Sequence, residues 1–311
     1  MTDTFAVQVR GLRMSFGAVE VLHGVDFEVA SGEVFCLLGP NGAGKTTTLE
    51  ILEGFRPPTA GTVRVLGLDP AANGARLRER AGMVLQECGF PRQARVGELI
   101  GHWRTYYPNP RPLADLLEVV ELTAARNTQV SKLSAGQRRR LDFALALAGD
   151  PDIVFLDEPT TGFDPEARLR CWAAIENLRG LGKTILLTTH YLDEAERLAD
   201  RIAILRAGRI ELSGTTQEVA ALAGLATRIS FITPPAVRRG QVAPPDGIDI
   251  AARGPLSVCH TPNAAMTLRQ LLGWALENRL GDLDGLTVTA PSLEDTYLQL
   301  TGAAPDIREQ T

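Results

Sequence analysis

Runs of apolar residues, separated by glycine-rich or polar segments, give the first picture of the fold. Residues 7–10 and 19–29 contain alternating or clustered apolar and β-branched residues, which predicts an antiparallel sheet at the start of the chain. Residues 33–38 and 153–156 are almost wholly apolar, and residues 184–189 contain an Ile-Leu-Leu run between threonines. A short strand that is apolar on both faces is typical of a buried parallel strand. The pattern therefore predicts a small antiparallel sheet followed by an α/β core.

A long segment before the second buried strand has a different pattern. In residues 91–150 the spacing of Leu, Val and Ala is mostly helical, which predicts a helical subdomain inserted into the α/β core. We expect the antiparallel sheet, the α/β core and this insertion to form one domain over residues 5–220.

The composition changes from residue 224 onward. Turn residues are frequent in residues 233–247, which lie between the strand-like segments 229–232 and 286–289. This change predicts a small, separate C-terminal α+β domain over residues 224–302.

The last part of the chain contains the signals of one more helix. Ser292 and Asp295 have the spacing of a capping box, and the helix would run through Leu300 and close at Gly302. Residues 303–311 have no periodicity, so we expect a flexible tail.

Composition and charge narrow the class of protein. At ~150 residues per domain, the length of 311 residues allows about two domains. A hydrophobic content of 44% and a charged content of 22% are typical of a folded globular protein. The formal net charge of -5 argues against nonspecific nucleic-acid binding driven by counterion release.

Neither a membrane span nor a secretory signal is evident from the sequence pattern. No apolar run reaches the ~18 residues of a spanning helix, and the first residues lack a charged and then apolar pattern. We therefore expect a membrane role to come through a partner. The cysteines form no CxxC pair, so we expect reduced thiols of a cytosolic protein and no zinc site. These cysteines are Cys36, Cys88, Cys171 and Cys259.

The glycine-rich segment after the first buried strand carries the clearest chemistry. It fits the pattern Gly-x4-Gly-Lys-Thr with a strand before it and a helix-like segment after it. Backbone N–H groups of such a loop surround a polyphosphate, and the helix N-terminus adds partial positive charge. Lys45 would neutralise the β and γ oxygens, and the Thr46 hydroxyl would bind Mg²⁺. The predicted nucleotide-binding residues are Gly39, Pro40, Asn41, Gly42, Ala43, Gly44, Lys45, Thr46 and Thr47.

Two acidic residues follow the second buried strand, which we expect to neighbour the first. Asp157 would hold the hydration shell of Mg²⁺. Glu158, one residue closer to the γ-phosphate, would orient and deprotonate the attacking water. A polar end to the strand before Pro159 would give the same two residues, but their combination with the glycine-rich loop favours the metal and base roles.

Residues 132–140, Lys-Leu-Ser-Ala-Gly-Gln-Arg-Arg-Arg, resemble the signature sequence of ATP-binding cassette (ABC) ATPases. The resemblance covers about residues 5–220 and implies a P-loop NTPase (RecA-like) core. It also implies that Ser134, Gly136 and Gln137 meet the γ-phosphate held by the opposite subunit of a head-to-tail dimer. The residues alone allow a simpler interpretation, in which Ser134 caps a helix with a solvated arginine face.

The remaining motifs of the ABC family follow in order. Phe16 resembles the aromatic residue that stacks on adenine, and Gln86 resembles the glutamine that touches Mg²⁺ and links the site to the transport subunit. Asp164 lies in a segment that resembles the loop aligning the two sites of a dimer. His190 resembles the switch histidine that contacts the γ-phosphate. A single histidine after an apolar strand is more often structural, but the ordered series of motifs favours the switch role.

The resemblance implies an energy-coupling ATPase, in which two copies close on two molecules of ATP with Mg²⁺ and drive a membrane partner. Residues 291–302 are similar to the C-terminal segment of drug-resistance ABC ATPases, which pair with a separate ABC-2 permease. An amphipathic helix on its own small sheet fits the same spacing. We expect the ATP-hydrolysing subunit of an ABC-2 exporter for a drug-like or other small amphipathic molecule, at the cytoplasmic face of the cell membrane.

Two other functions remain open from the sequence. The first is a soluble ABC ATPase that acts on nucleic acid or the ribosome, although such proteins usually carry two cassettes and a basic face. The second is a nucleotide sensor without catalysis, which would be expected to lack Glu158 or His190.

Overall fold

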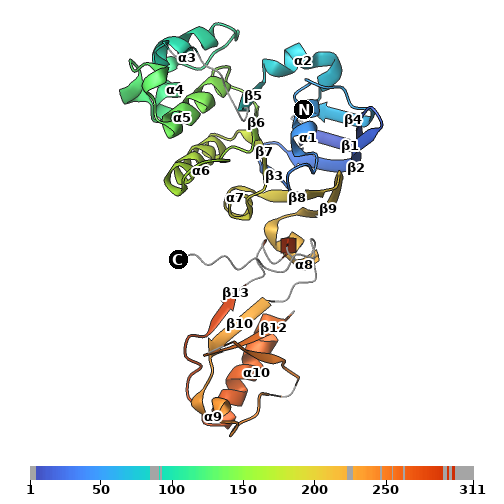
Figure 1. The fold of residues 1–311 in the computed structure, drawn as a ribbon, viewed down its shortest axis with the longest axis vertical. Coiled ribbons are helices and arrows are strands. Elements are labelled where there is room, and N and C mark those ends of the chain that lie inside the picture. Colours follow the sequence, from blue (N-terminus) through green and yellow to red (C-terminus); the bar gives the residue numbers. More distant parts are fainter. Residues whose placement is uncertain are drawn as a thin grey trace. The chain divides into compact units, whose positions relative to one another are not determined.

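The computed structural model describes residues 5–84, 91, 93–222, 227–245, 247–253, 255–261, 263–289, 293 and 296–297. The chain divides into two compact units, Met1–Thr215 and Thr216–Thr311 (Figure 1). The predicted capping box of Ser292 and Asp295 and the predicted tail 303–311 lie outside the described residues.

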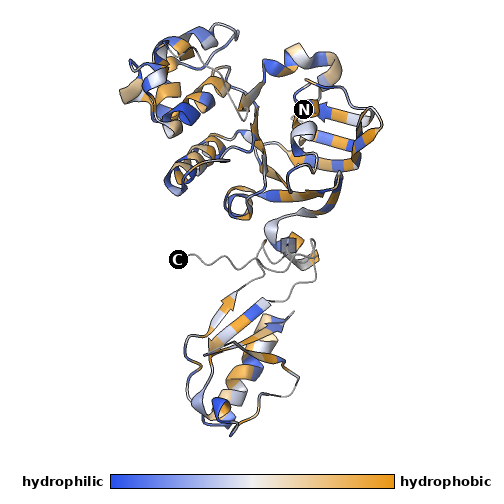
Figure 2. Cartoon of the chain, in the orientation of Figure 1, coloured by the Kyte–Doolittle hydropathy of each residue, from blue (hydrophilic) through white to orange (hydrophobic). Residues whose placement is uncertain are grey.

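The first unit opens with a three-stranded antiparallel sheet, as predicted. Its strands β1 (Phe5–Phe16), β2 (Val19–Ala30) and β4 (Ala60–Val65) lie in the order β2-β1-β4. Apolar and polar residues alternate along much of these strands (Figure 2), because one face of the sheet packs on the core. Leu12 and Leu22 are fully buried there.

The larger sheet of this unit has six strands in the order β5-β6-β7-β3-β8-β9. The pairs from β5 to β8 are parallel, and β9 is antiparallel to β8. Every residue of β3, β6 and β7 is buried, as their apolar sequences predict. The strands are β5 (Ala81–Val84), β6 (Ile153–Asp157), β7 (Thr184–Thr189), β3 (Val34–Leu38), β8 (Arg201–Arg206) and β9 (Arg209–Gly214).

The expectation that the second buried strand neighbours the first was wrong. Strand β7 lies between β3 and β6 and pairs with both. Leu38 of β3 is in register with Thr189, and Asp157 of β6 is in register with Thr188. The parallel strands therefore end at one edge of the sheet, and β7 supplies the middle of that edge.

Helices connect the strands of the larger sheet. The helix α1 begins where the glycine-rich loop ends, α6 joins β6 to β7, and α7 joins β7 to β8. Among the residues described, no helix is both long and apolar enough to cross a bilayer. The helices are α1 (Lys45–Leu52), α2 (Pro70–Arg78), α6 (Pro165–Gly180) and α7 (Leu192–Leu198).

The region predicted to be mostly helical lies between β5 and β6. It contains three α-helices and two single turns of 3₁₀-helix, and the buried Leu99, Leu116 and Leu141 come from its three α-helices. These elements are α3 (Val96–Arg104), α4 (Leu113–Val119), η1 (Thr123–Ala125), η2 (Val130–Lys132) and α5 (Ala135–Ala146).

The second unit has its own sheet and its own hydrophobic core. The strands lie in the order β11-β12-β10-β13, all antiparallel, and residues of α10 such as Leu271 and Trp274 form a core with Ile229 and Phe231 of β10. The sequence predicted β10 and β13 but not β11, β12 or α10. The elements are α8 (Thr216–Leu222), β10 (Thr227–Ile232), α9 (Pro235–Arg238), β11 (Ile250–Arg253), β12 (Leu256–Thr261), α10 (Ala264–Glu277) and β13 (Thr287–Thr289).

Candidate active site

The glycine-rich loop joins the end of β3 to the start of α1, and close packing requires two of its glycines. A Cβ atom at Gly39 would lie 2.2 Å from the carbonyl oxygen of Leu205. Gly44 has a φ of 105°, and a Cβ atom there would lie 2.5 Å from Leu22 Cδ2. Side chains at these positions would push the loop away from its neighbours, so glycine is needed for this backbone path.

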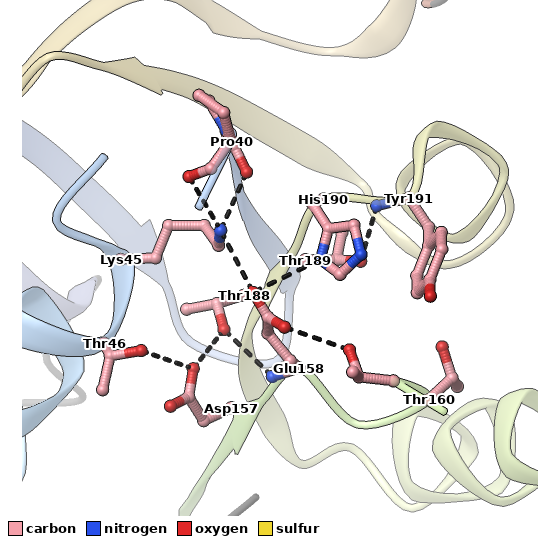
Figure 3. Close-up of polar contacts among 12 residues, drawn as sticks. Pro40, Lys45, Thr46, Asp157, Glu158, Thr160, Thr188, Thr189, His190 and Tyr191 are labelled. Atoms are coloured by element: carbon pink, nitrogen blue, oxygen red, sulfur yellow. Dashed lines mark hydrogen bonds and ion pairs between the residues drawn. The ribbon is translucent and has the colours of Figure 1, made fainter. Parts of the chain in front are cut away.

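Lys45, the first residue of α1, is buried and directed back into the loop. Its ammonium group donates hydrogen bonds to the carbonyl oxygens of Gly39, at 2.8 Å, and Pro40, at 3.1 Å. The same nitrogen lies 3.1 Å from Glu158 Oε1 (Figure 3). The cation is thus compensated within the chain by two carbonyl oxygens and one carboxylate.

Asp157 ends β6 and faces two hydroxyl groups. The Thr188 hydroxyl, from β7, donates to Asp157 Oδ1 at 2.6 Å. The Thr46 hydroxyl, from α1, lies 3.4 Å from the same oxygen. Hydroxyl and carboxylate oxygens from three elements therefore meet at this edge of the sheet (Figure 3).

Glu158 follows β6 in a left-handed conformation, with a φ of 43°. Its backbone N–H donates to Thr188 Oγ1 at 3.0 Å, and its Oε2 accepts from the Thr161 hydroxyl at 3.0 Å. Burial opposes ionisation of this carboxyl group, but the hydrogen bond and charge of Lys45 outweigh it and, with Thr161 and His190, lower its pKa. The side chain is therefore held as a carboxylate.

His190 lies directly after β7 and faces the same carboxylate. Its Nδ1 is 3.3 Å from Glu158 Oε1, a distance for an ion pair, but the two groups lack the alignment of a hydrogen bond. The imidazole ring lies against the Tyr191 ring, with 4.1 Å between the ring centroids. His190 Nδ1 is thus buried without a hydrogen-bond partner among the described residues.

A cavity of about 630 Å³ opens beside Lys45. It collects eight of the predicted site residues and two residues that the sequence did not assign to a site. Its lining is formed by Val21, Asn41, Gly42, Gly44, Lys45, Thr46, Thr47, Glu158, Thr161 and His190.

Several other predicted site residues do not line this cavity. Ser134 and Gln137 form a capping box at the start of α5, with Gln137 N donating to Ser134 Oγ at 3.2 Å and Ser134 N donating to Gln137 Oε1 at 3.0 Å. Gly136 lies in the same first turn. Asp164 caps α6 and accepts from Ala167 N at 2.8 Å.

The remaining predicted site residues lie in the loop, in the core and at the end of a strand, and one lies outside the described residues. Gly39 and Pro40 face Lys45 through their carbonyl groups, and Ala43 is buried in the core below the loop. Phe16 ends β1 with 42% of its surface exposed. Gln86 lies outside the described residues.

Comparisons with known proteins place this chain in a family. The family model described as "ABC transporter" matches residues 22–161. The Nod factor export ATP-binding protein I of Rhizobium sp. (strain N33) is 36% identical over 96% of this chain and 97% of its own length. The chain belongs to the ABC transporter ATP-binding proteins. It is an ABC transporter ATPase.

Further relatives support the same assignment of this ABC ATPase. The daunorubicin resistance ATP-binding protein DrrA3 of Streptomyces coeruleorubidus is 34% identical over 99% of both chains. A solved ATP-binding subunit of an ABC transporter matches the fold with a TM-score of 0.64 and 27% identity, over 70% of this chain and 93% of that chain. The predicted P-loop NTPase fold with an antiparallel sheet is therefore confirmed.

Thr188, Val21 and Thr161 lie at the candidate site of this ABC ATPase but were not predicted as site residues. Thr188 contacts both Asp157 and Glu158, because β7 lies between β3 and β6. The two threonines that end this buried strand were the available signal, since polar side chains are costly in a buried strand unless they are hydrogen-bonded. Val21 has no local signal, because its place in the lining depends on the approach of β2 to the loop.

Proposed function

We propose that this ABC ATPase binds ATP in the cavity beside Lys45 and hydrolyses it with Glu158 as the general base. The observation that carries the proposal is the convergence of Lys45, Glu158 and His190 on one cavity at the carboxyl edge of the sheet. A cation can neutralise phosphate charge, a carboxylate can accept a proton from water, and an imidazole can donate a hydrogen bond to phosphate, so one concave site with all three groups suits phosphoryl transfer to water.

In this proposal the phosphate groups of ATP take over the contacts of Lys45. The ammonium group now contacts Glu158 Oε1 at 3.1 Å. Phosphate oxygens carry more negative charge than the carbonyl oxygens that Lys45 now contacts, and the backbone N–H groups of the loop would hold several of them beside the cation. The phosphates therefore compete well with the present partners of Lys45. Loss of the Lys45 contact leaves Glu158 free to accept a hydrogen bond from water.

The chemical step then follows from the position of Glu158. Its carboxylate accepts a proton from a water molecule, and the water oxygen forms a bond to the γ-phosphorus. The bond from the γ-phosphorus to the oxygen shared with the β-phosphate breaks, which yields ADP and phosphate. His190, on the other side of Glu158 Oε1, would donate a hydrogen bond to the γ-phosphate and fix the water beside the base.

The residues at the end of β6 fit a magnesium ion. Mg²⁺ prefers oxygen ligands and keeps several of its water molecules, so one hydroxyl and one carboxylate are a sufficient protein contribution. Thr46 and Asp157 offer these oxygens 3.4 Å apart, and we propose that they hold the ion, with Gln86 as a further ligand. When bound, Mg²⁺ would neutralise charge on the β and γ oxygens.

We propose that two copies form the complete site. ABC ATPases dimerise and pair with membrane subunits. Ser134, Gly136 and Gln137 lie together at the N-terminus of α5 but do not line the cavity of their own chain. In the proposed head-to-tail dimer they meet the γ-phosphate bound by the partner copy, where the helix N-terminus favours negative charge. Asp164, at the start of α6, would align the two sites.

The transport function is proposed from the relatives. One relative is named for Nod factor export and another for daunorubicin resistance. We propose that this ATPase powers export of a drug-like or other small amphipathic molecule. Its partner would be a separate ABC-2 permease, which holds the ATPase at the cytoplasmic face of the membrane.

The assignment of the base is tested with Glu158→Gln, which keeps the shape of the side chain and removes its charge. We expect phosphate release to fall by at least about 100-fold, the usual minimum contribution of a general base, while MgATP stays bound and holds the dimer closed. Steady-state phosphate release and gel filtration with MgATP measure these two results.

A matched control is Glu176→Gln on the exposed surface of α6, where the carboxylate pairs only with Arg197 among the described residues. This variant is expected to hydrolyse ATP at the normal rate. If Glu158→Gln also hydrolysed ATP at that rate, Glu158 would not be the base.

The exporter proposal is tested by co-expression with the membrane protein encoded next to this chain. We expect the two proteins to co-purify from detergent-solubilised membranes and the membrane protein to stimulate ATP hydrolysis. Recovery only in the soluble fraction, with stimulation by nucleic acid, would contradict the exporter and support the alternative role on nucleic acid.

A further inference from the structure

The aromatic residue at the end of β1 lies in an exposed apolar turn. Phe16 pairs with Val19 across the β1–β2 hairpin, and 42% of Phe16 and 65% of Val19 are exposed. Val21, two residues further along β2, lines the cavity beside Lys45. An apolar surface therefore continues from the phosphate-binding cavity toward the Phe16 ring.

One face of the Phe16 ring is already occupied. The guanidinium carbon of Arg56 lies 4.7 Å from the ring centroid. A cation over the face of an aromatic ring is attracted by the negative charge of that face. Because a phenyl ring has two faces, a nucleotide base could stack on Phe16 only on the face opposite Arg56.

Arg56 is held in place from the helix that carries Lys45. Its Nε donates to Glu50 Oε2 at 2.8 Å, and its backbone N–H donates to the Glu50 carbonyl oxygen at 3.3 Å. Glu50 lies on α1, which begins at Lys45. The position of the guanidinium group is thus fixed relative to the helix that would bind the phosphates.

The loop that carries Arg56 is also attached to the end of β1. Thr59 N donates to the Arg13 carbonyl oxygen at 2.9 Å, and Ser15 N donates to Thr59 Oγ1 at 3.0 Å. Arg56 therefore lies in a loop that is hydrogen-bonded to both α1 and β1. Phe16 has no hydroxyl group that could fix its ring by a hydrogen bond, so packing against Arg56 supplies this constraint.

We propose that Arg56 is a positioning residue for the nucleotide base. Arg56 covers one face of Phe16 and leaves the other face for a purine. The base would then stack on a ring whose position is fixed by a residue that is hydrogen-bonded to α1. Glu50 holds the guanidinium and offsets its charge, which keeps Arg56 on the ring and away from the phosphates. This inference rests on the proposed binding of ATP in the cavity beside Lys45.

The test compares a ligand that has a base with one that lacks it. Binding of MgATP and of magnesium tripolyphosphate is measured at equilibrium on the full chain and on Arg56→Gln. We expect Arg56→Gln to bind ATP about two- to fivefold more weakly, because the ring must then be ordered when the base stacks on it. The ~0.5–1 kcal/mol of an exposed cation–π contact sets the upper limit of this loss. Tripolyphosphate affinity is expected to stay unchanged, because the variant leaves the phosphate-binding loop intact.

Two further variants separate positioning from a general structural effect. Glu50→Ala removes the side-chain acceptor of the guanidinium group without touching Phe16, and we expect the same selective loss of ATP affinity. In a Phe16→Ala background, Arg56→Gln is expected to change nothing further, because the ring that it positions is gone.

Each contrary result has a distinct meaning. Equal weakening of ATP and tripolyphosphate would show that Arg56 supports α1 as a whole and would overturn the inference, as would unchanged ATP affinity in Arg56→Gln. If the unaltered chain bound neither ligand, the proposed function would fail, and the inference would fail with it.

Discussion

At the scale of single residues, two glutamates near the candidate active site, Glu158 and the more deeply buried Glu53, have opposite surroundings. Glu158 faces Lys45, so its pKa is lowered despite burial. Glu53, at the end of α1, is 4% exposed, and burial, followed by repulsion from Asp157 and Glu50, raises its pKa from 4.5 to about 8. The same residue type is therefore held charged at one position and protonated at the other.

The raised pKa of Glu53 predicts a dependence of stability on pH. The folded chain holds this proton up to about pH 8, whereas the unfolded chain releases it near 4.5. Protonated Glu53 therefore contributes to the free energy of unfolding. This contribution is complete below pH 4.5 and is lost as the pH rises through 8. We expect Glu53→Gln, which cannot ionise, to unfold at higher denaturant concentration than the unaltered chain at pH 8.

The size of this effect is on the order of a few kcal/mol, since each unit of pKa shift corresponds to about 1.4 kcal/mol. Urea unfolding of both proteins at pH 5 and pH 8 measures it. At pH 5 the two midpoints should lie close together. If the advantage of Glu53→Gln over the unaltered chain were no larger at pH 8 than at pH 5, the raised pKa of Glu53 would be contradicted.

Much of the site could be predicted residue by residue, because its motifs are local in sequence. Lys45, Glu158 and His190 were predicted as site residues, and the structure places them in the lining of one cavity. The contacts of Thr188 and Arg56 could not be predicted, because each depends on which distant element lies beside it. Thr188 meets Asp157 through the order of strands, and Arg56 meets Phe16 through the path of a loop.

At the scale of secondary-structure elements, the N-terminus of α5 has one role in this structure and a second role in the proposed dimer. Ser134 caps the helix in this structure. The proposed dimer also requires Ser134 to meet the phosphate group of the partner copy. A cap needs only an acceptor oxygen, whereas a phosphate site also needs the absence of negative charge, so two substitutions distinguish the roles.

We expect Ser134→Ala to lose about 0.5–2 kcal/mol of stability with the cap. Ser134→Asp keeps an acceptor at the cap and is expected to unfold close to the unaltered chain, but its carboxylate would repel the γ-phosphate and reduce ATP hydrolysis. Thermal unfolding and phosphate release, measured on both variants, give the comparison. Normal hydrolysis by Ser134→Asp would leave Ser134 as a helix cap alone.

The elements themselves could be predicted where their pattern is strong. The apolar runs of β3, β6 and β7 identified three buried strands, but their order in the sheet could not be predicted, because an apolar run does not specify its neighbour. In the second unit, β11, β12 and α10 lie in residues 250–277, which the sequence placed in an α+β domain without indicating these individual elements. Asn263, which caps α10 by accepting from Met266 N, was the available signal.

At the scale of the whole molecule, the two compact units have separate cores. The core of the second unit contains Phe231, Leu271 and Trp274, all from within that unit. The residues that line the cavity fall between Val21 and His190, within the first unit. The described residues that line the cavity therefore all belong to the first unit.

This separation predicts that the chain cut after Thr215 still folds and binds ATP. We expect its affinity for MgATP to lie within about twofold of the full chain, a difference of ~0.4 kcal/mol. Equilibrium binding and a single cooperative thermal transition are the measurements. A truncated chain that folds but no longer binds ATP would show that residues beyond 215 contribute to the site.

The register of the central strands has a consequence for how such chains can vary in length. Leu38 of β3 and Thr189 of β7 are paired, so the glycine-rich loop and His190 leave the sheet side by side. Inserting or deleting one residue inside either strand would turn the following side chains to the opposite face and separate the two. Among descendants of a common ancestor, gains and losses of residues should therefore accumulate in surface connections and spare these strands.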